Sequence, residues 1–309
     1  MMQRQDEKDT QKIRIWNRVE ARFEIEKIYG EKPMRFLYEN PLGSIIANHF
    51  MSKSFMSQIM GLYHDSKLSA LKVDQFIKKY VINIDEFESK KYSSFNDFFI
   101  RKFKSGKRIF ADGDLFPAFC EGRYLGASET KSNQRFKIKD AMISVGELLG
   151  SQDSTLFEGG PLLIARLCPV DYHRFHFPDE GHILSHARIS GSLHSVSPVA
   201  LKFDPEIFLK NEREITLLET KTFGKLAYIE VGAMGVGKIV QANSMESGSE
   251  FQRGGEKGYF LFGGSTVIIV GEKGKWTPDP DLLEKTKSGI ETYIKLGDKI
   301  GTLASRASS

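Results

Sequence analysis

The pattern of apolar residues and glycines changes near Ser94, and this change limits the folds that the chain can adopt. From about residue 10 to residue 88 glycines are few and apolar residues recur at helical spacing. After Ser94, short β-branched or aromatic runs separated by glycine appear at residues 161–167, 225–231 and 266–270. The first pattern is typical of helices and the second of strands. We therefore predict an α+β protein, in which N-terminal amphipathic helices (residues 1–88) precede a β-rich, mainly antiparallel catalytic domain (residues 89–309).

Two predictions concern the end of the chain. Residues 278–288 have the composition of a short helix that begins after a proline, and residues 294–301 read as a strand, a turn and a second strand. No internal repeat stands out.

Composition narrows the class of protein. With 309 residues, 40% of them hydrophobic, the chain can bury one large core or two modest ones. Lysine and arginine outnumber aspartate and glutamate by 44 to 40, a balance too mild to indicate nucleic acid but compatible with an anionic membrane surface. Cys120 and Cys168 are the only cysteines, which favours a reducing, cytoplasmic setting over a disulfide framework. We expect neither a signal peptide nor a membrane span.

The most membrane-like stretch is residues 40–64, which contains a single lysine or arginine, Lys53. Its apolar residues include Leu42, Ile45 and Phe50, and lysines follow from Lys67 onward. An amphipathic helix of this kind can lie on a bilayer or pack on the core of its own protein. The sequence pattern alone leaves both interpretations open.

A glycine pair precedes a hydroxyl in Gly263-Gly264-Ser265-Thr266, directly before the apolar run 267–270. Glycine lets the backbone bend, so the serine hydroxyl can approach the preceding carbonyl carbon, as an intramolecular acyl shift requires. The same residues would also suit a β-bulge before a buried strand. Ser265 is our candidate for the reactive residue.

Histidines are concentrated in Asp171-Tyr-His173-Arg-Phe-His176. In an extended segment His173 and His176 lie on opposite faces, so one could activate a nucleophile while the other moves a proton. Two structural histidines would give the same pattern. A metal site is a weaker alternative, because the segment lacks a His-Glu-x-x-His motif and its aromatic residues favour a strand.

Other segments contain residues that could orient a histidine or bind a phosphate group. Glu121 and Asp112 are candidates for the carboxylate that would orient a histidine, although both lie beside glycine as turn residues do. Residues 232–239 resemble a phosphate-binding loop up to Ile239, where that loop needs serine or threonine. We therefore expect a glycine-rich β segment and no bound nucleotide.

Several motifs in order resemble the signatures of phosphatidylserine decarboxylases, which are pyruvoyl-dependent membrane enzymes. They are Ser94-Phe-Asn-Asp-Phe-Phe99, Asp171-Tyr-His-Arg-Phe-His176, Asn211-Glu-Arg-Glu214, Val231-Gly-Ala-Met-Gly-Val-Gly237 and Phe262-Gly-Gly-Ser-Thr266. The resemblance extends from about Phe36 to Gly301. It implies self-cleavage between Gly264 and Ser265 into a large β chain (1–264) and a small α chain (265–309). It assigns His176 as the base for cleavage and His173 to proton handling during decarboxylation.

The same resemblance implies the reaction and its setting. Ser265 would become a covalent pyruvoyl group, which forms a Schiff base with phosphatidylserine and accepts electrons as CO2 leaves, yielding phosphatidylethanolamine. Neither a metal nor a nucleotide is implied. We expect a peripheral protein on the cytoplasmic face of the cell membrane, and the lipid substrate favours docking over self-packing for part of residues 40–64 in the N-terminal region 1–88. A homodimer is compatible with this interpretation.

One position departs from the family pattern. The family usually has Pro-Ala-Asp-Gly where this chain has Phe119-Cys-Glu-Gly122, so Glu121 replaces the aspartate expected to orient the base. The extra methylene changes the reach of the carboxylate. This departure motivates an alternative, a degenerate relative that only binds anionic membrane. A third possibility is a hydrolase that uses Ser265 and His176 on an external substrate.

Overall fold

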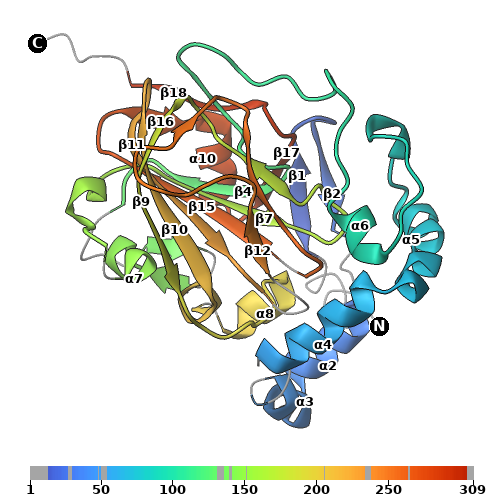
Figure 1. The fold of residues 1–309 in the computed structure, drawn as a ribbon. Helices are drawn as coiled ribbons and strands as arrows, with labels where there is room; N and C mark the ends of the chain where they lie inside the picture. Colours follow the sequence, from blue (N-terminus) through green and yellow to red (C-terminus); the bar gives the residue numbers. More distant parts are fainter. Residues whose placement is uncertain are drawn as a thin grey trace, which may run out of the picture.

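The computed structural model describes residues 13–26, 30–47, 49, 54–130, 136–138, 141–150, 152–204, 206–233, 238–263 and 265–304. A large sheet forms its centre (Figure 1). The strands follow the order β13 (Glu250–Phe251), β9 (Gly181–Ile189), β10 (Arg213–Thr220), β11 (Gly224–Val231), β15 (Ser265–Gly271), β7 (Leu162–Leu167), β4 (Gly122–Ala127), β17 (Glu291–Ile294), β1 (Arg14–Asn17) and β2 (Arg22–Ile25). Every neighbouring pair is antiparallel except β1 and β17. The predicted fold class is confirmed.

Smaller sheets accompany the large one. The first contains β12 (Ile239–Gln241), β14 (Glu256–Phe260) and β8 (Arg174–His176); the second contains β16 (Trp276–Pro278), β18 (Lys299–Leu303) and β3 (Leu115–Pro117); the third pairs β5 (Phe136–Ile138) with β6 (Ala141–Ile143). β12 confirms that the glycine-rich segment continues as a strand at Ile239, although residues 234–237 lie outside the described part. The predicted strands around residues 294–301 are β17 and β18.

Most helices precede residue 100 in the chain. They are α2 (Glu31–Glu39), α3 (Pro41–Ile46), α4 (Ser54–Asp65), the 3₁₀ helix η2 (Lys67–Lys72), α5 (Val73–Tyr80), η3 (Ile84–Glu86) and α6 (Phe95–Phe99). Later helices are α7 (Val145–Leu149), η4 (Thr155–Phe157), α8 (Pro198–Phe203), α9 (Ile207–Lys210) and α10 (Pro280–Lys287), the last being the helix predicted at residues 278–288. Figure 1 shows α2 to α5, in blue, along one side of the β structure. In the described part of the chain, no helix has the length and apolar character needed to cross a bilayer.

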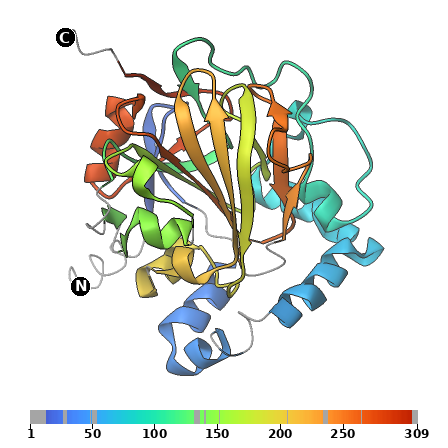
Figure 2. The same ribbon diagram turned by 60° about the vertical axis from the view of Figure 1, so that its left-hand side comes forward.

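Alternation along the central strands divides the core between the two faces of the sheet. On β15, Val267 and Ile269 belong to one apolar cluster, whereas Ile268 and Val270 belong to the other. Successive side chains of a strand point to opposite faces, so a strand covered on both sides is apolar throughout. Helices α7, α8 and α9 cover one face, and the three-stranded sheets β12–β14–β8 and β16–β18–β3 cover the other together with α10. Figure 2 shows the green and yellow helices α7 and α8 on one side of the central strands and the orange strands β12 and β14 on the other. Ser265 shares its face with Val267.

The structure corrects the prediction for the beginning of the chain. Residues 14–25 form the hairpin β1–β2 at one edge of the large sheet instead of a helix. The Oδ1 atom of Asn17 accepts hydrogen bonds from the N–H groups of Val19 (3.0 Å) and Glu20 (3.1 Å), which closes the turn. The run is too short to show a clear period, and its partner, β17, lies at the other end of the sequence. Low glycine content alone therefore misassigned this segment.

Candidate active site

Ser265 is the first residue of β15, in the middle of the large sheet. Its register places it opposite Leu167 of β7, and its side chain is fully buried. Gly263, two residues earlier, has a φ of 152°, a value that residues with a Cβ atom rarely adopt. Gly264, the other residue of the expected cleavage site, lies outside the described residues.

His173 contacts the serine hydroxyl. Its Nδ1 atom lies 3.1 Å from Oγ of Ser265, and its Nε2 atom lies 2.8 Å from the carbonyl oxygen of Cys168. A carbonyl oxygen can only accept, so Nε2 must carry the proton and donate it. Nδ1 of the neutral ring is then the acceptor for the Ser265 hydroxyl. The ring orientation therefore gives this histidine the tautomer of a base toward Ser265.

The surroundings of His173 keep its ring neutral. Burial lowers the pKa of His173 well below the ordinary value; the hydrogen bond to the Cys168 carbonyl opposes this effect in part, and the positive charges of Arg101 and Arg123 lower the pKa further. The ring of Phe99 stacks on the imidazole, with the centroids 3.8 Å apart and the planes at 22°. A neutral imidazole at physiological pH can accept a proton without first losing one.

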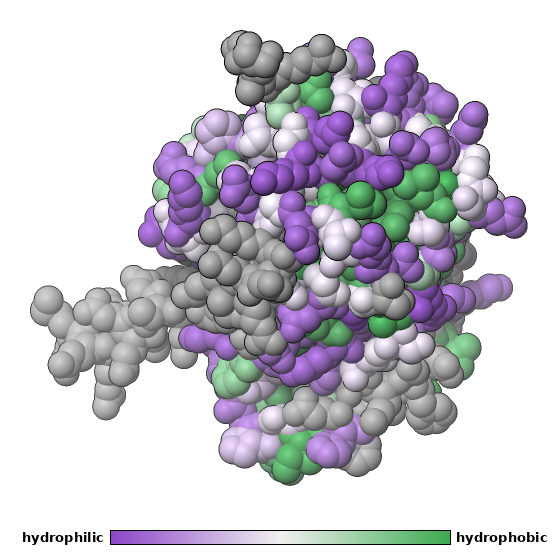
Figure 3. All heavy atoms as spheres, turned by 90° about the vertical axis from the view of Figure 1, so that its left-hand side faces the viewer, coloured by the Kyte–Doolittle hydropathy of each residue, from purple (hydrophilic) through white to green (hydrophobic). Residues whose placement is uncertain are grey.

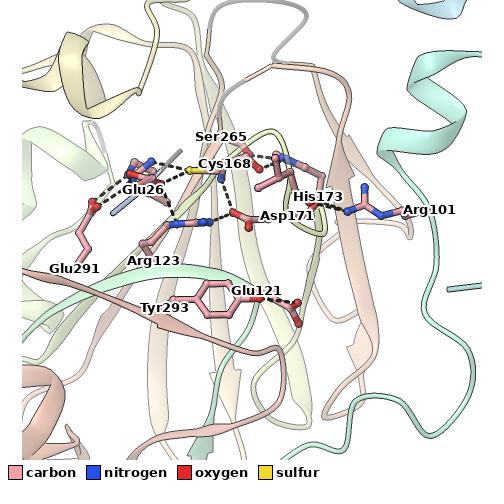
Figure 4. Close-up of polar contacts among 12 residues, drawn as sticks. Glu26, Arg101, Glu121, Arg123, Cys168, Asp171, His173, Ser265, Glu291 and Tyr293 are labelled. Atoms are coloured by element: carbon pink, nitrogen blue, oxygen red, sulfur yellow. Dashed lines mark hydrogen bonds and ion pairs between the residues drawn. The ribbon is translucent and has the colours of Figure 1, made fainter. Parts of the chain in front are cut away.

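The loop that carries His173 rests on a buried network of charges (Figure 4). Asp171 accepts a hydrogen bond from the N–H of Cys168 (2.6 Å) and pairs with Arg123. Arg123 also pairs with Glu26 (2.9 Å), which belongs to the chain just after β2. Asp171 thus fixes the backbone of Cys168, and the carbonyl of Cys168 in turn orients the ring of His173.

The same network continues through Arg166 of β7. Its guanidinium pairs with Glu26 (2.7 Å) and Glu291 (2.6 Å), and it donates to the sulfur of Cys168 (3.0 Å). Burial raises the pKa of Glu26, but Arg166 and Arg123 outweigh that effect, so the pKa lies below its usual value. Each charge is stabilised only because its partners are in place.

His176 lies in the same segment but has other partners. Its Nδ1 atom lies 2.9 Å from the carbonyl oxygen of Gly254, and its Nε2 atom lies 3.1 Å from the hydroxyl of Tyr172. By the same reasoning Nδ1 donates to the carbonyl and Nε2 accepts from the tyrosine. Burial lowers the pKa of His176 as well. Both ring nitrogens are therefore occupied away from Ser265.

Glu121 forms an ion pair with an arginine. Its carboxylate accepts from Nε (2.6 Å) and Nη2 (3.0 Å) of Arg108, from the Tyr293 hydroxyl (3.0 Å) and from the N–H of Leu296 (3.2 Å). The segment that contains Glu121 still lies beside His176, because the backbone N–H of His176 donates to the backbone carbonyl of Phe119 at 2.8 Å. Asp112, the second candidate, has a fully exposed side chain. Among the described contacts, neither carboxylate orients a histidine.

The remaining candidates lie elsewhere. His182 and His186 are on β9, beside Glu219 (3.3 Å) and the hydroxyl of Thr216 (3.0 Å), respectively. Cys120 and Cys168 are both buried and free. In the part of the chain that the structure describes, none of these side chains forms a hydrogen bond or an ion pair with Ser265.

Comparison with known proteins places the chain. A family model described as phosphatidylserine decarboxylase matches residues 95–302. The phosphatidylserine decarboxylase proenzyme of Clostridium tetani is 42% identical over 295 residues, which cover 94% of this chain and 98% of that protein. The proenzyme of Clostridium novyi is 40% identical over 294 residues (94% and 99%), and that of Desulfitobacterium hafniense is 39% identical over 293 residues (94% and 98%).

The chain belongs to the phosphatidylserine decarboxylase family. The resemblance assigned His176 as the base for cleavage and Glu121 as the carboxylate that orients it, and both roles stay predictions. In the structure Nδ1 of His173 lies beside Oγ of Ser265, whereas the ring of His176 bonds to Tyr172 and Gly254, and Glu121 pairs with Arg108. An extended backbone separates the two histidines, because residues on opposite faces cannot both point toward β15.

Several residues of this phosphatidylserine decarboxylase family member support His173 without having been predicted from the sequence. Arg101 is buried, and its guanidinium donates to the carbonyl oxygens of Val170 (2.8 Å) and Asp171 (2.9 Å). Burial lowers the pKa of Arg101 to about 10. Arg166 offered a usable signal, because a charged residue inside the apolar run 162–167 indicates a buried partner. Nothing in the sequence indicated that Glu26 and Glu291 would be those partners.

Proposed function

We propose that this protein converts phosphatidylserine to phosphatidylethanolamine and CO2, using a pyruvoyl group made from Ser265 when the chain cuts itself between Gly264 and Ser265. The observation that carries the proposal is the contact between His173 and Ser265, a buried serine beside a neutral imidazole of the right tautomer. Membership of the phosphatidylserine decarboxylase family supports it, as do relatives named proenzymes.

Self-cleavage begins at the serine hydroxyl. As Oγ attacks the Gly264 carbonyl, the hydroxyl proton goes to a base, the peptide C–N bond breaks and an ester forms, leaving Ser265 with a free amine. Loss of the Cα proton then expels the upstream chain as a carboxylate, and hydrolysis of the remaining dehydroalanine releases ammonia and leaves the pyruvoyl group. The geometry supports His173, rather than His176, as the group that accepts the first proton.

The pyruvoyl group supplies a carbonyl that can take up the electrons left on the substrate Cα after CO2 departs. The residues present fit such a group, because Ser265 is buried beside a titratable ring and away from bulk water. His173 remains adjacent to this position after cleavage, so it can also hold and return a proton at the substrate Cα. This second role agrees with the one that the resemblance assigned to it.

The outer side of α4 and η2 suits a lipid surface. Leu62, Leu68 and Leu71 are 75%, 71% and 80% exposed, and Lys67 and Lys72 lie among them. The opposite side of α4 packs inward, with the ring of His64 on that of Phe262 at 4.1 Å. Large apolar side chains beside lysines match a bilayer that contains anionic lipid. The enzyme would thus lie on the cytoplasmic face of the membrane as a peripheral protein, with these helices toward the bilayer.

The surface away from these helices has another character. Figure 3 views the molecule from the left of Figure 1, and there hydrophilic side chains predominate among the described residues, with hydrophobic ones in separate groups. A mixed surface of this kind needs no apolar partner. The contrast between this surface and the outer side of α4 and η2 favours docking through one side over nonspecific binding through the whole surface.

The alternative of a degenerate, non-catalytic relative rested on Glu121. In the structure Glu121 pairs with Arg108 and does not contact Ser265 or His173 through any described hydrogen bond. No observation specifically favours the non-catalytic alternative.

Electrophoresis of the purified protein tests the proposal. Cleavage releases residues 265–309 from the 35.0 kDa chain, and mass spectrometry should find this fragment blocked by a pyruvoyl group. Ser265→Ala should stay intact, because it lacks the attacking hydroxyl. Thr266→Ser, which keeps Ser265, is a matched control that should still cleave. A wild-type chain that remains whole, or a small fragment with a free amino terminus, would contradict the proposal.

A further inference from the structure

Helix α6 carries the motif Ser94-Phe-Asn-Asp-Phe-Phe99, to which the chemistry above gives no role. Ser94 caps the helix by accepting a hydrogen bond from the N–H of Asp97 at 3.1 Å. Phe95, Asn96, Phe98 and Phe99 are all buried. A five-residue helix gains little stability from its own hydrogen bonds, so these side chains must fix its place.

Asn96 connects this helix to the segment before the cleavage site. Its Oδ1 atom accepts a hydrogen bond of 2.8 Å from the backbone N–H of Phe262, two residues before Gly264. Its Nδ2 atom donates to the carboxylate of Asp65, at the end of α4, also at 2.8 Å. A carboxylate only accepts, so Asp65 fixes the direction of the amide and presents Oδ1 to Phe262.

The helix also contacts the histidine. Phe99 stacks on the ring of His173, while the ring of Phe262 lies against Phe99 (5.2 Å) and Phe95 (5.1 Å). The backbone leading to Phe262 is held as well, since the N–H of Phe260 donates to the carbonyl of His173 at 2.9 Å. One short helix therefore touches both the segment that carries the scissile carbonyl and the ring that faces Ser265.

We propose that Asn96, oriented by Asp65, is a positioning residue for self-cleavage: it holds the Phe262 backbone so that the Gly264 carbonyl meets the hydroxyl of Ser265. A glycine pair has no conformational preference strong enough to do this by itself. The hydrogen bond to Asn96 fixes the chain just before the glycine pair, and β15 fixes the chain just after it. This inference rests on the self-cleavage proposed above.

The test is a time course of cleavage during cell-free synthesis of the full chain, followed by electrophoresis. Asn96→Ala and Asn96→Asp should each slow cleavage on the order of 10²-fold, the size expected when a reacting group is displaced by about 1 Å. The first removes the acceptor for Phe262, and the second places a carboxylate against Asp65. The double variant Asp65→Asn/Asn96→Asp reverses the donor and the acceptor and restores both hydrogen bonds, so it should cleave at least about tenfold faster than Asn96→Asp.

Two controls separate positioning from general damage. Asp97→Asn changes the same helix at a carboxylate that pairs with Lys90 (2.5 Å) and Ser93 and does not contact Phe262, so cleavage should stay within about threefold of wild type. Thermal unfolding of each variant, made uncleavable with Ser265→Ala, shows whether it is folded.

The outcomes distinguish this inference from the proposed function. If wild type remains whole, self-cleavage itself fails. If wild type cleaves and Asn96→Ala cleaves as fast, or if the folded double variant is no faster than Asn96→Asp, Asn96 has no positioning role. Rescue by the double variant supports the inference where thermal unfolding shows that Asn96→Asp is itself folded, because a loss of folding then does not explain its slow cleavage.

Discussion

Two regions of the molecule differ from the usual distribution of side chains in opposite ways. Charged side chains are buried around His173, and large apolar side chains are exposed on the outer side of α4 and η2. Around His173, charged residues are buried: Glu26, Arg123, Arg166, Asp171 and Glu291 are each less than a tenth exposed. On α4 and η2, Leu62, Leu68 and Leu71 are at least 71% exposed. The buried charges find their partners within the chain, whereas the three leucines are largely exposed to solvent. The first region therefore carries the proposed chemistry, and the second carries the proposed docking on a lipid surface.

Removal of the His173 ring, which the buried charges support, should have the largest effect on activity. His173→Ala should lower CO2 release from phosphatidylserine vesicles by about 10²- to 10⁴-fold, because the positioned proton acceptor is lost. His182→Ala, whose side chain is 45% exposed, is the matched control and should keep its activity. Unchanged CO2 release from folded His173→Ala would contradict the proposed site.

Electrophoresis of the same variant sharpens the result. An uncut His173→Ala chain would show that this ring serves cleavage, as its contact with Ser265 indicates. A cut but inactive chain would confine His173 to decarboxylation and return the cleavage role to His176. His176→Ala is measured in parallel. If His173 is the base for cleavage, the His176→Ala chain should still be cut.

Removing a central charge should cost stability. Arg166→Leu leaves Glu26 and Glu291 without their shared partner in the interior, so the free energy of unfolding should fall by about 3–5 kcal/mol. Urea denaturation in the Ser265→Ala background measures this on an uncut chain. Arg22→Leu removes an exposed pair with Glu24 and should cost less than about 1 kcal/mol. Equal losses in the two variants would show that the network adds no special stability.

The buried histidines should make stability depend on pH. Burial lowers the pKa of His173 and His176 in the folded chain, whereas the unfolded chain takes up protons near pH 6.5. Below about pH 6.5 the unfolded state binds more protons, so each histidine lowers the free energy of unfolding by up to about 1.4 kcal/mol per pH unit, until the folded pKa is reached. Above about pH 6.5 the contribution is constant.

Variants can separate this slope from an opposing one. His176→Gln should make the fall below pH 6.5 shallower, because one fewer proton is taken up on unfolding. Glu230 acts in the other direction: burial raises its pKa to about 7, so the folded state binds the extra proton and gains stability as the pH falls. Glu230→Gln should therefore steepen the fall. Urea denaturation from about pH 7.5 to 5.5 measures both, and identical slopes would contradict the assignment.

The outer leucines should matter least for folding and most for docking. Leu68→Asp/Leu71→Asp should change the free energy of unfolding by no more than about 1 kcal/mol, since both side chains are already exposed. Binding to vesicles that contain phosphatidylserine should fall at least about tenfold, because two apolar contacts are lost and two negative charges are added. Leu156→Asp, on η4, is the control, as Leu156 is 42% exposed elsewhere on the surface. Equal loss in flotation by the control would remove the distinction between the two sides.

Much of the fold could be predicted from local patterns. The strand that begins at Ser265, the helix α10 and the strands β17 and β18 follow from apolar alternation and turn residues in single short segments. The hairpin at residues 14–25 could not, because its stability comes from pairing with β17, more than 260 residues away in the sequence. The expectation that part of residues 40–64 docks on a bilayer stays a prediction; in the structure α4 packs through His64 and exposes Leu62 on another side.

The sequence by itself indicated Ser265 as the candidate reactive residue, together with the segments that surround it, because a glycine pair, a hydroxyl and a histidine-rich run are local chemical features. Only the tertiary structure decided which side chains meet. His173 and Ser265 are 92 positions apart, and Arg166 and Glu291 are 125 apart. Strand register and burial select one of two nearby histidines and pair an arginine with carboxylates from opposite ends of the chain. Local periodicity specifies which face a residue occupies, but the opposing face is supplied by the rest of the fold.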